Sequence, residues 1–162
     1  MMTNNPLSRI SLTNPIHFFA LGLGSGLIHP APGTWGTLAG LIVGCLLLQI
    51  MSVFSFAIFT ALCFLLGCYL CQQTADDMGV HDHGSIVWDE FVGIFTVLLS
   101  IPELSLIWCS IAFVVFRIFD ILKPYPIRYF DHRLESGFGI MLDDVLAAIY
   151  TVISISILND LV

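Results

Sequence analysis

Residues 91–116 read FVGIFTVLLSIPELSLIWCSIAFVVF, and the fold depends on whether this apolar stretch forms one helix or two. Pro102 and Glu103 interrupt it, and proline is typical of a turn that ends a helix. We therefore expect a hairpin of two helices, at 86–101 and 104–122. The alternative is one long helix with a proline kink, which would place the residues before and after it on opposite faces of a membrane.

The composition is that of a membrane protein. Hydrophobic residues make up 57% of the chain and charged residues only 10%, and the mean hydropathy is +0.95. Further apolar runs of helical length cover 35–51, 53–71 and 140–158. At about 1.5 Å per residue, such runs approach the thickness of a hydrocarbon core, about 30 Å. The sequence predicts an all-α, membrane-embedded bundle of about four to five hydrophobic helices, in one domain covering 1–162.

Acidic residues are crowded into two windows, 76–90 and 117–144, which hold all but two of the chain's 12 carboxylates. An ionised carboxylate is costly to bury in apolar surroundings unless a cation compensates it. The pairs Asp89-Glu90 and Asp143-Asp144 lie at the expected starts of two helices, where acidic residues can also simply complement the helix dipole. Two pairs of adjacent acidic residues are more than the helix dipoles require.

We predict that these four carboxylates bind a divalent metal. Carboxylate oxygens without sulfur or imidazole ligands favour Mg²⁺, Mn²⁺ or Ca²⁺ over zinc. The chain has only five Lys and Arg residues, too few for a basic stripe, which excludes a role in binding nucleic acid.

Three charged residues recur at helical spacing near the end of the 104–122 run. Arg117, Asp120 and Lys123 are separated by three residues each and would share one face of a helix. We predict that Asp120 binds or orients the metal, and that Arg117 and Lys123 bind phosphate. An internal salt bridge accounts for the same spacing and remains the alternative.

Glycine and threonine precede the first long apolar run, in the segment PAPGTWGT at 30–37. Glycines allow backbone N–H groups to approach an anion, and Thr34 or Thr37 can cap the following helix. We predict that Thr34, Gly36 and Thr37 bind phosphate, while an ordinary capped turn is the alternative. His29, next to this segment, is a candidate proton carrier.

The hairpin brings the polar segments at 33–37, 72–90 and 117–139 to one face of the membrane. All five Lys and Arg residues then lie on that face, and such an excess of positive charge marks the cytoplasmic side. We therefore expect one composite site on cytoplasmic loops.

Four motifs, in order along the chain, resemble the phosphatidylglycerophosphatase A family. They are Gly33-Thr34-Trp35-Gly36-Thr37; Val87-Trp88-Asp89-Glu90 followed by Gly93; Phe116-Arg117 with Phe119-Asp120 and Lys123-Pro124-x-Pro126; and Gly137-x-Gly139-Ile140-Met141-Leu142-Asp143-Asp144. The resemblance extends from about His17 to Ala148. It implies an all-α enzyme of the bacterial inner membrane that removes the terminal phosphate of phosphatidylglycerol phosphate with Mg²⁺ and gives phosphatidylglycerol.

We accordingly expect a multi-pass lipid phosphatase of phospholipid biosynthesis, with Mg²⁺ as cofactor and a membrane lipid as substrate. The expected catalytic residues are Asp89, Glu90, Asp120, Asp143, Asp144 and His29. Two other functions remain open, a transporter of divalent cations or protons and a small membrane interaction subunit. A transporter would need its carboxylates near the bilayer midplane with access from both sides.

Overall fold

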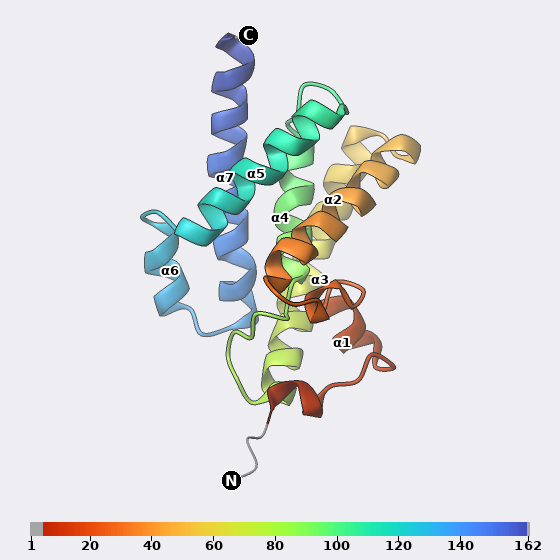
Figure 1. Cartoon of the computed structure of the whole chain (residues 1–162), viewed down its shortest axis with the longest axis vertical. Coiled ribbons are helices and arrows are strands. Elements are labelled where there is room, and N and C mark those ends of the chain that lie inside the picture. The colour runs from red at the N-terminus through yellow and green to blue at the C-terminus, as the bar shows by residue number, and fades with distance from the viewer. Residues whose placement is uncertain (1–4, 162) are drawn as a thin grey trace.

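The computed structural model describes residues 5–161, and over this range the chain is helical and contains no strand (Figure 1). This confirms the all-α prediction. Two 3-10 helices are present, η1 (Pro6–Arg9) and η2 (Ser25–Leu27). The α-helices are α1 (Pro15–Ala20), α2 (Pro32–Ile50), α3 (Val53–Met78), α4 (Trp88–Leu98), α5 (Leu106–Leu122), α6 (Ile127–Arg133) and α7 (Gly137–Leu161).

The apolar stretch at 91–116 forms a hairpin, as the interruption at Pro102 predicts. Helix α4 ends at Leu98, and the side chain of Ser105 caps α5 by accepting a hydrogen bond from the Trp108 N–H. Figure 1 shows α5 running back obliquely from this turn and crossing α7, and α5 packs against both α4 and α7. The turn lies at the same end of the bundle as the turn between α2 and α3. The kinked single helix is therefore excluded.

Helix α4 is the centre of the bundle. It packs against α2, α3, α5 and α7, and every residue of α4 except Thr96 is buried. Its phenylalanine rings pack in the core, where Phe95 lies 5.4 Å from Phe56 of α3 in a tilted arrangement and 6.0 Å from Phe91 in an edge-to-face one, measured between ring centroids. An apolar helix covered on all sides is stabilised by this burial rather than by an amphipathic pattern.

Three helices, α2, α3 and α7, are long and apolar enough to cross a membrane. Their outward faces carry large exposed apolar side chains such as Leu46, Phe54 and Ile153, which suits contact with lipid. All five helices expected from the apolar runs are present, but α4 has only 11 residues and α5 has 17. Only three of the five apolar helices are therefore candidates for crossing a membrane.

The hairpin also gathers the polar segments at one end of the bundle. In Figure 1, the start of α2, the end of α3, the start of α4, the end of α5, α6 and the start of α7 all lie below the two turns at the upper end. Sequence segments that are 80 residues apart, such as Thr37 and Arg117, are in contact there. Motifs that are far apart in the sequence therefore meet within the fold.

Candidate active site

The first turn of α4 is held from three sides. The Val87 N–H donates to the Ala20 carbonyl at 2.9 Å, and the Trp88 indole N–H donates to the Cys63 carbonyl of α3 at 3.1 Å. On the third side, Gly36 of α2 lies against Val87 so closely that a Cβ at Gly36 would be 2.5 Å from the Val87 Cβ. These contacts fix the position of Asp89 and Glu90, which follow directly.

Five carboxylates from three helices meet around this turn. Ligand oxygens of Asp89, Asp143 and Asp144 lie within 4.8 Å of one another, and so do those of Glu90, Asp120 and Asp144. Asp144 belongs to both groups. The structure therefore brings together the four predicted metal ligands and Asp120, and either group could hold a divalent cation.

Several of these carboxylate oxygens are buried without a hydrogen-bond donor. Asp89 Oδ1, Glu90 Oε2 and Asp144 Oδ2 have no partner within the described part of the chain, although the three residues are 8%, 8% and 1% exposed. A buried polar atom without a partner costs about 1–3 kcal/mol, and more when it is charged. Oxygens arranged in this way are stabilised by a bound cation.

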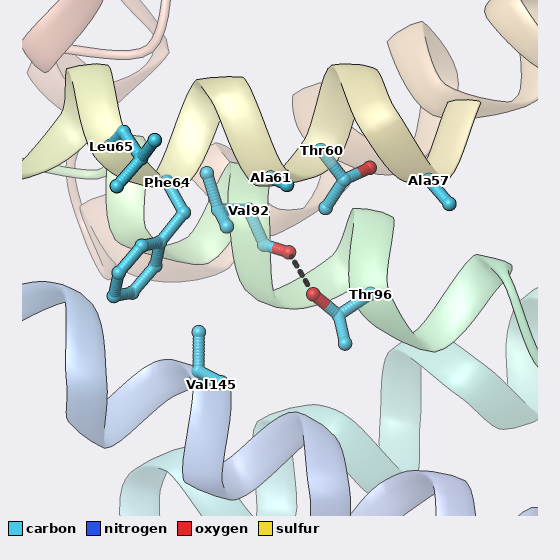
Figure 2. A pocket seen from close by; sticks show the side chains of 8 residues that line it. All are labelled: Ala57, Thr60, Ala61, Phe64, Leu65, Val92, Thr96 and Val145. Atoms are coloured by element: carbon cyan, nitrogen blue, oxygen red, sulfur yellow. Dashed lines mark hydrogen bonds between the residues drawn. The ribbon is translucent and has the colours of Figure 1, made fainter. Parts of the chain in front are cut away.

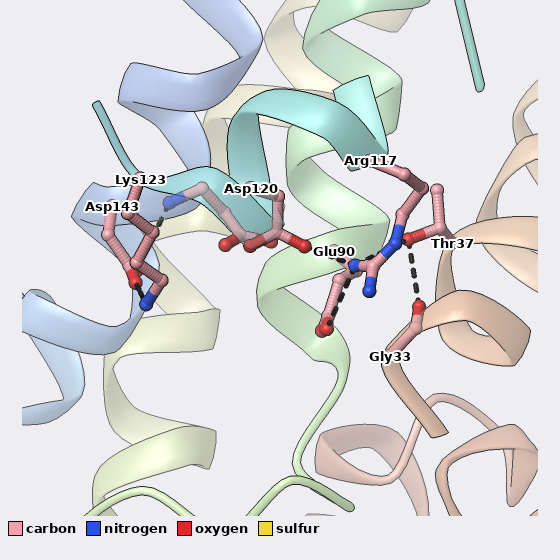
Figure 3. Close-up of polar contacts among 8 residues, drawn as sticks. Gly33, Thr37, Glu90, Arg117, Asp120, Lys123 and Asp143 are labelled. Carbon is pink, nitrogen blue, oxygen red and sulfur yellow. Dashed lines mark hydrogen bonds and ion pairs between the residues drawn. The ribbon is translucent and has the colours of Figure 1, made fainter. Parts of the chain in front are cut away.

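Arg117 is the cation nearest to Glu90 and Asp120. Its guanidinium forms an ion pair with Asp120 and lies 3.6 Å from Glu90 Oε1, and Nη1 donates to Thr37 Oγ1 at 3.5 Å. Figure 3 shows Thr37 in turn donating to the Gly33 carbonyl, at 2.9 Å. The ion pair between Arg117 and Asp120, which helical spacing offered as the alternative to metal and phosphate binding, is present, and Thr37 joins it to α2.

Lys123 does not share the face of α5 with Arg117. Helix α5 ends at Leu122, and Lys123 has a left-handed backbone with φ of 43°, so its ammonium group turns to the far side of Asp120 in Figure 3. There it donates to Asp131 at 2.7 Å and to Asp143. Burial lowers the pKa of Lys123, but the two carboxylates raise it more, so the pKa lies above the usual range.

The segment at 30–37 is helical from Pro32 onward and is not a turn that precedes the helix. Ala31 occupies the N-cap position without a side-chain cap, so the expected capping by Thr34 or Thr37 is wrong. The close approach occurs at Gly33 instead, where a Cβ would lie 2.4 Å from Glu90 Oε1 and 3.2 Å from Arg117 Nη2. Gly33 thus borders the site, whereas the sequence pattern had indicated Thr34, Gly36 and Thr37.

Among the described residues, the side chains of Thr34 and His29 form no hydrogen bond or ion pair with the carboxylates. Thr34 is half-buried beside Arg117 in an apolar groove of about 370 Å³ between α2 and α5. His29 is exposed, and no hydrogen bond or ion pair within residues 5–161 joins its side chain to the carboxylates. The role of His29 as proton carrier stays a prediction without a contact to support it.

A second apolar groove, of about 430 Å³, runs between α3, α4 and α7 (Figure 2). Val92 and Val145 line it, one turn after Asp89 and directly after Asp144 in the sequence. Phe64 covers one side, and Thr96 satisfies its hydroxyl by donating to the Val92 carbonyl at 2.8 Å. The bundle therefore has a second apolar groove, lined by sequence neighbours of the carboxylates but not by the carboxylates themselves.

Comparisons with known proteins identify the family. The model of the family described as phosphatidylglycerophosphatase A matches residues 18–159. The chain is 72% identical over 153 residues to a phosphatidylglycerophosphatase A of Haemophilus influenzae, an alignment covering 94% of each chain. It is 47% identical over 143 residues to that of Escherichia coli, covering 88% of this chain and 82% of the relative. No solved structure matches the chain. On these matches, the chain belongs to the phosphatidylglycerophosphatase A family.

Proposed function

We propose that the protein is a phosphatidylglycerophosphatase of phospholipid biosynthesis, which hydrolyses the terminal phosphomonoester of phosphatidylglycerol phosphate to phosphatidylglycerol and phosphate. The relatives named for this activity support the assignment. The observation that carries it is a cluster of buried carboxylates beside an arginine, at one end of a bundle with helices that are long enough to span a membrane. The site faces the cytoplasm in the bacterial inner membrane.

The surroundings of Arg117 favour a lipid over a soluble phosphate ester. Arg117 lines the groove formed with Thr34, Phe113 and Ile118, and this lining is almost wholly apolar. Arginine binds phosphate oxygens with two parallel hydrogen bonds, and apolar side chains beside it can contact the hydrocarbon part of the same molecule. A substrate with a phosphate at one end and acyl chains at the other meets both conditions.

Mg²⁺ is the proposed cofactor. The donor set fits this ion, because it consists of carboxylate oxygens alone, several of which lack any other partner. Asp89, Glu90, Asp143 and Asp144 would hold it, with Asp120 beside them. When bound, Mg²⁺ supplies positive charge for the phosphoryl oxygens and lowers the pKa of a bound water.

Residues of the protein itself orient the substrate and hold the site in place. Arg117 offers its guanidinium to the phosphate, and the Asp120 and Thr37 oxygens hold that guanidinium in place. Lys123 holds Asp143 through its ion pair, which also keeps Asp131 beside it. Lys123 therefore acts through the carboxylates and not as a free phosphate ligand.

Phosphate release by the purified protein tests this proposal. With Mg²⁺, phosphatidylglycerol phosphate should be hydrolysed much faster than glycerol 3-phosphate, and chelation of Mg²⁺ should stop the reaction. Arg117→Ala should lose most of the rate, while Arg9→Ala, which removes an exposed arginine of η1, should not. Equal turnover of the soluble ester, or no turnover of the lipid with Mg²⁺ supplied, contradicts the assignment.

The structure gives a transporter less support. Beyond the carboxylates, the bundle is filled by packed aromatic rings of α3 and α4, including Phe56, Phe91 and Phe95. A transported ion would need a polar route through this region. The carboxylates are therefore arranged for access from one end of the bundle.

A further inference from the structure

A cationic cavity lies outside the carboxylate site, at the corner between α5 and α6. Its volume is about 580 Å³, within the range of small-molecule binding sites. The side chains that give it charge and aromatic character are Lys123, Tyr125, Arg128, Tyr129, His132 and Arg133. Three of the chain's five Lys and Arg residues thus line a single cavity.

Two of these cations lack a carboxylate partner. Lys123 is paired with Asp131 and Asp143, whereas neither Arg128 nor Arg133 forms an ion pair within residues 5–161. The chain carries a net charge of −7, so carboxylates are not scarce. The Arg133 guanidinium is instead held over the Tyr129 ring, 4.7 Å from its centroid. Two exposed, uncompensated arginines in one cavity attract an anion.

The aromatic residues indicate where this anion lies. Tyr125 is 80% exposed and Tyr129 is 43% exposed, and tyrosines with an apolar ring and a polar hydroxyl gather at the membrane interface. Directly before the cavity, α5 exposes the apolar side chains of Ile118 and Ile121. The cavity therefore lies where an apolar, lipid-facing surface meets an interfacial one, at the level of lipid headgroups.

We propose that this cavity binds the phosphodiester of an anionic glycerophospholipid, with Arg128 and Arg133 as its ligands. The diester belongs either to the substrate itself, whose monoester end reaches the carboxylates, or to an anionic lipid of the surrounding bilayer. The first source rests on the proposed function, and the second does not. Lys123 joins the cavity to the carboxylate site, because it lines the one and bonds to Asp143 in the other.

Binding of a labelled lipid tests the proposal without any turnover. The whole protein in neutral detergent is titrated with fluorescent short-chain phosphatidylglycerol, and with phosphatidylcholine that carries the same label. The double variant Arg128→Gln/Arg133→Gln should bind phosphatidylglycerol on the order of 10- to 30-fold more weakly, given about 1 kcal/mol per cation near anionic lipid. Arg128→Lys/Arg133→Lys keeps the charge and should retain most of the affinity.

Arg9→Gln is the matched control, since Arg9 is also exposed but lies in η1, where its guanidinium contacts the Met78 carbonyl. This variant should bind like the unmodified protein. Unchanged binding by the double Gln variant overturns the proposal, and so does equal binding of both lipids by the unmodified protein.

Turnover then distinguishes the two sources of the diester. With the substrate as the only anionic lipid in neutral detergent, a raised KM at unchanged kcat assigns the cavity to the substrate. An unchanged KM there, together with loss of the response to added phosphatidylglycerol in vesicles, assigns it to a bilayer lipid. A double variant that matches the unmodified protein in both assays overturns the proposal. Normal lipid binding by a protein that hydrolyses no lipid phosphate would contradict the proposed function alone.

Discussion

Asp144 is the carboxylate shared by both candidate metal-binding groups, and its Oδ2 is buried without a hydrogen-bond partner among residues 5–161. We expect Asp144→Asn to lower the Mg²⁺-dependent rate by on the order of a hundred-fold or more, because both groups lose a charged ligand. In the presence of a chelator, the melting temperature should stay the same or rise, because the amide removes repulsion among the carboxylates. Phosphate release and thermal unfolding, each with and without Mg²⁺, measure the two effects.

The exposed Asp76 of α3, which lies outside both groups, provides the control as Asp76→Asn. This change should leave the rate and the stabilisation by Mg²⁺ unaltered. An Asp144→Asn protein that retains full turnover, or one that is stabilised by Mg²⁺ as strongly as the unmodified protein, would exclude Asp144 from metal binding.

Gly33 of α2 lies directly against Glu90. A methyl group there would meet Glu90 Oε1 at 2.4 Å and Arg117 Nη2 at 3.2 Å, so Gly33→Ala should displace both side chains and reduce the rate about ten-fold or more. Alanine favours a helix more than glycine does, so the protein should still fold. Gly84→Ala, whose Cβ would have its nearest neighbour at 3.8 Å, should keep the rate; a similar loss in both variants would contradict this explanation.

The sequence predicted which carboxylates come together, but not which groups the side chains of Arg117 and Lys123 contact. Helical spacing placed Arg117, Asp120 and Lys123 on one face, which holds only while the helix continues. Because the backbone at Lys123 is left-handed, that residue contacts Asp131 and Asp143 instead. Pro124 marks the end of a helix in the sequence, but the direction of the next side chain depends on tertiary contacts that no local pattern contains.

At the scale of the elements, the five apolar runs predicted the bounds of α2, α3, α4, α5 and α7 to within a few residues, except at the end of α3. A long hydrophobic run predicts a helix well because few other structures can accommodate it. Helix α3 continues to Met78, seven residues past the expected end, and carries Asp76 and Asp77 on its last turns. Short helices such as α1 and α6 have too few residues for a pattern to show.

A usable signal for helix packing was present in α2. Gly36, Gly40 and Gly44 recur every fourth residue, are all buried, and lie against α4. Small residues at this spacing allow two helices in a membrane to approach closely. This pattern indicates from sequence alone that another helix packs on that face, although it does not identify α4 as the partner.

Packing between α2 and α5 gives an element-scale prediction. The thiols of Cys45 on α2 and Cys109 on α5 lie 3.6 Å apart, the sulfurs being close enough to bond after a small rotation. A membrane-permeable oxidant should therefore form an intramolecular disulfide between them, detected by mass spectrometry after proteolysis. Cys45→Ser should abolish this product. Selective pairing of Cys68 with Cys71 in place of it would contradict the described packing.

At the scale of the whole molecule, the helical hairpin of α4 and α5 determines which loops share a side. We expect positions 81 and 103 to face opposite sides of the membrane, with 81 on the cytoplasmic side. The variants His81→Cys and Glu103→Cys, each in a background without the native cysteines, can be labelled with an impermeant thiol reagent in intact cells and in inverted vesicles. Labelling of both positions from the same side would contradict the arrangement.

The shortness of α4 has a consequence for how a lipid reaches the carboxylates. Eleven residues cover about 16 Å along a helix axis, roughly half of a hydrocarbon core. Trp88, the first residue of α4, bonds to Cys63 near the middle of the 26-residue α3. When α3 spans a bilayer, a phosphorylated headgroup must therefore sink below the headgroups of its neighbours before it meets Asp89.

The free energy of that descent grows with the thickness of the bilayer around the protein. Vesicles made from lipids with shorter acyl chains should accordingly support faster hydrolysis than vesicles made from longer ones, at equal substrate density. A single short helix would in this way make the rate of headgroup hydrolysis sensitive to the acyl-chain length of the surrounding membrane.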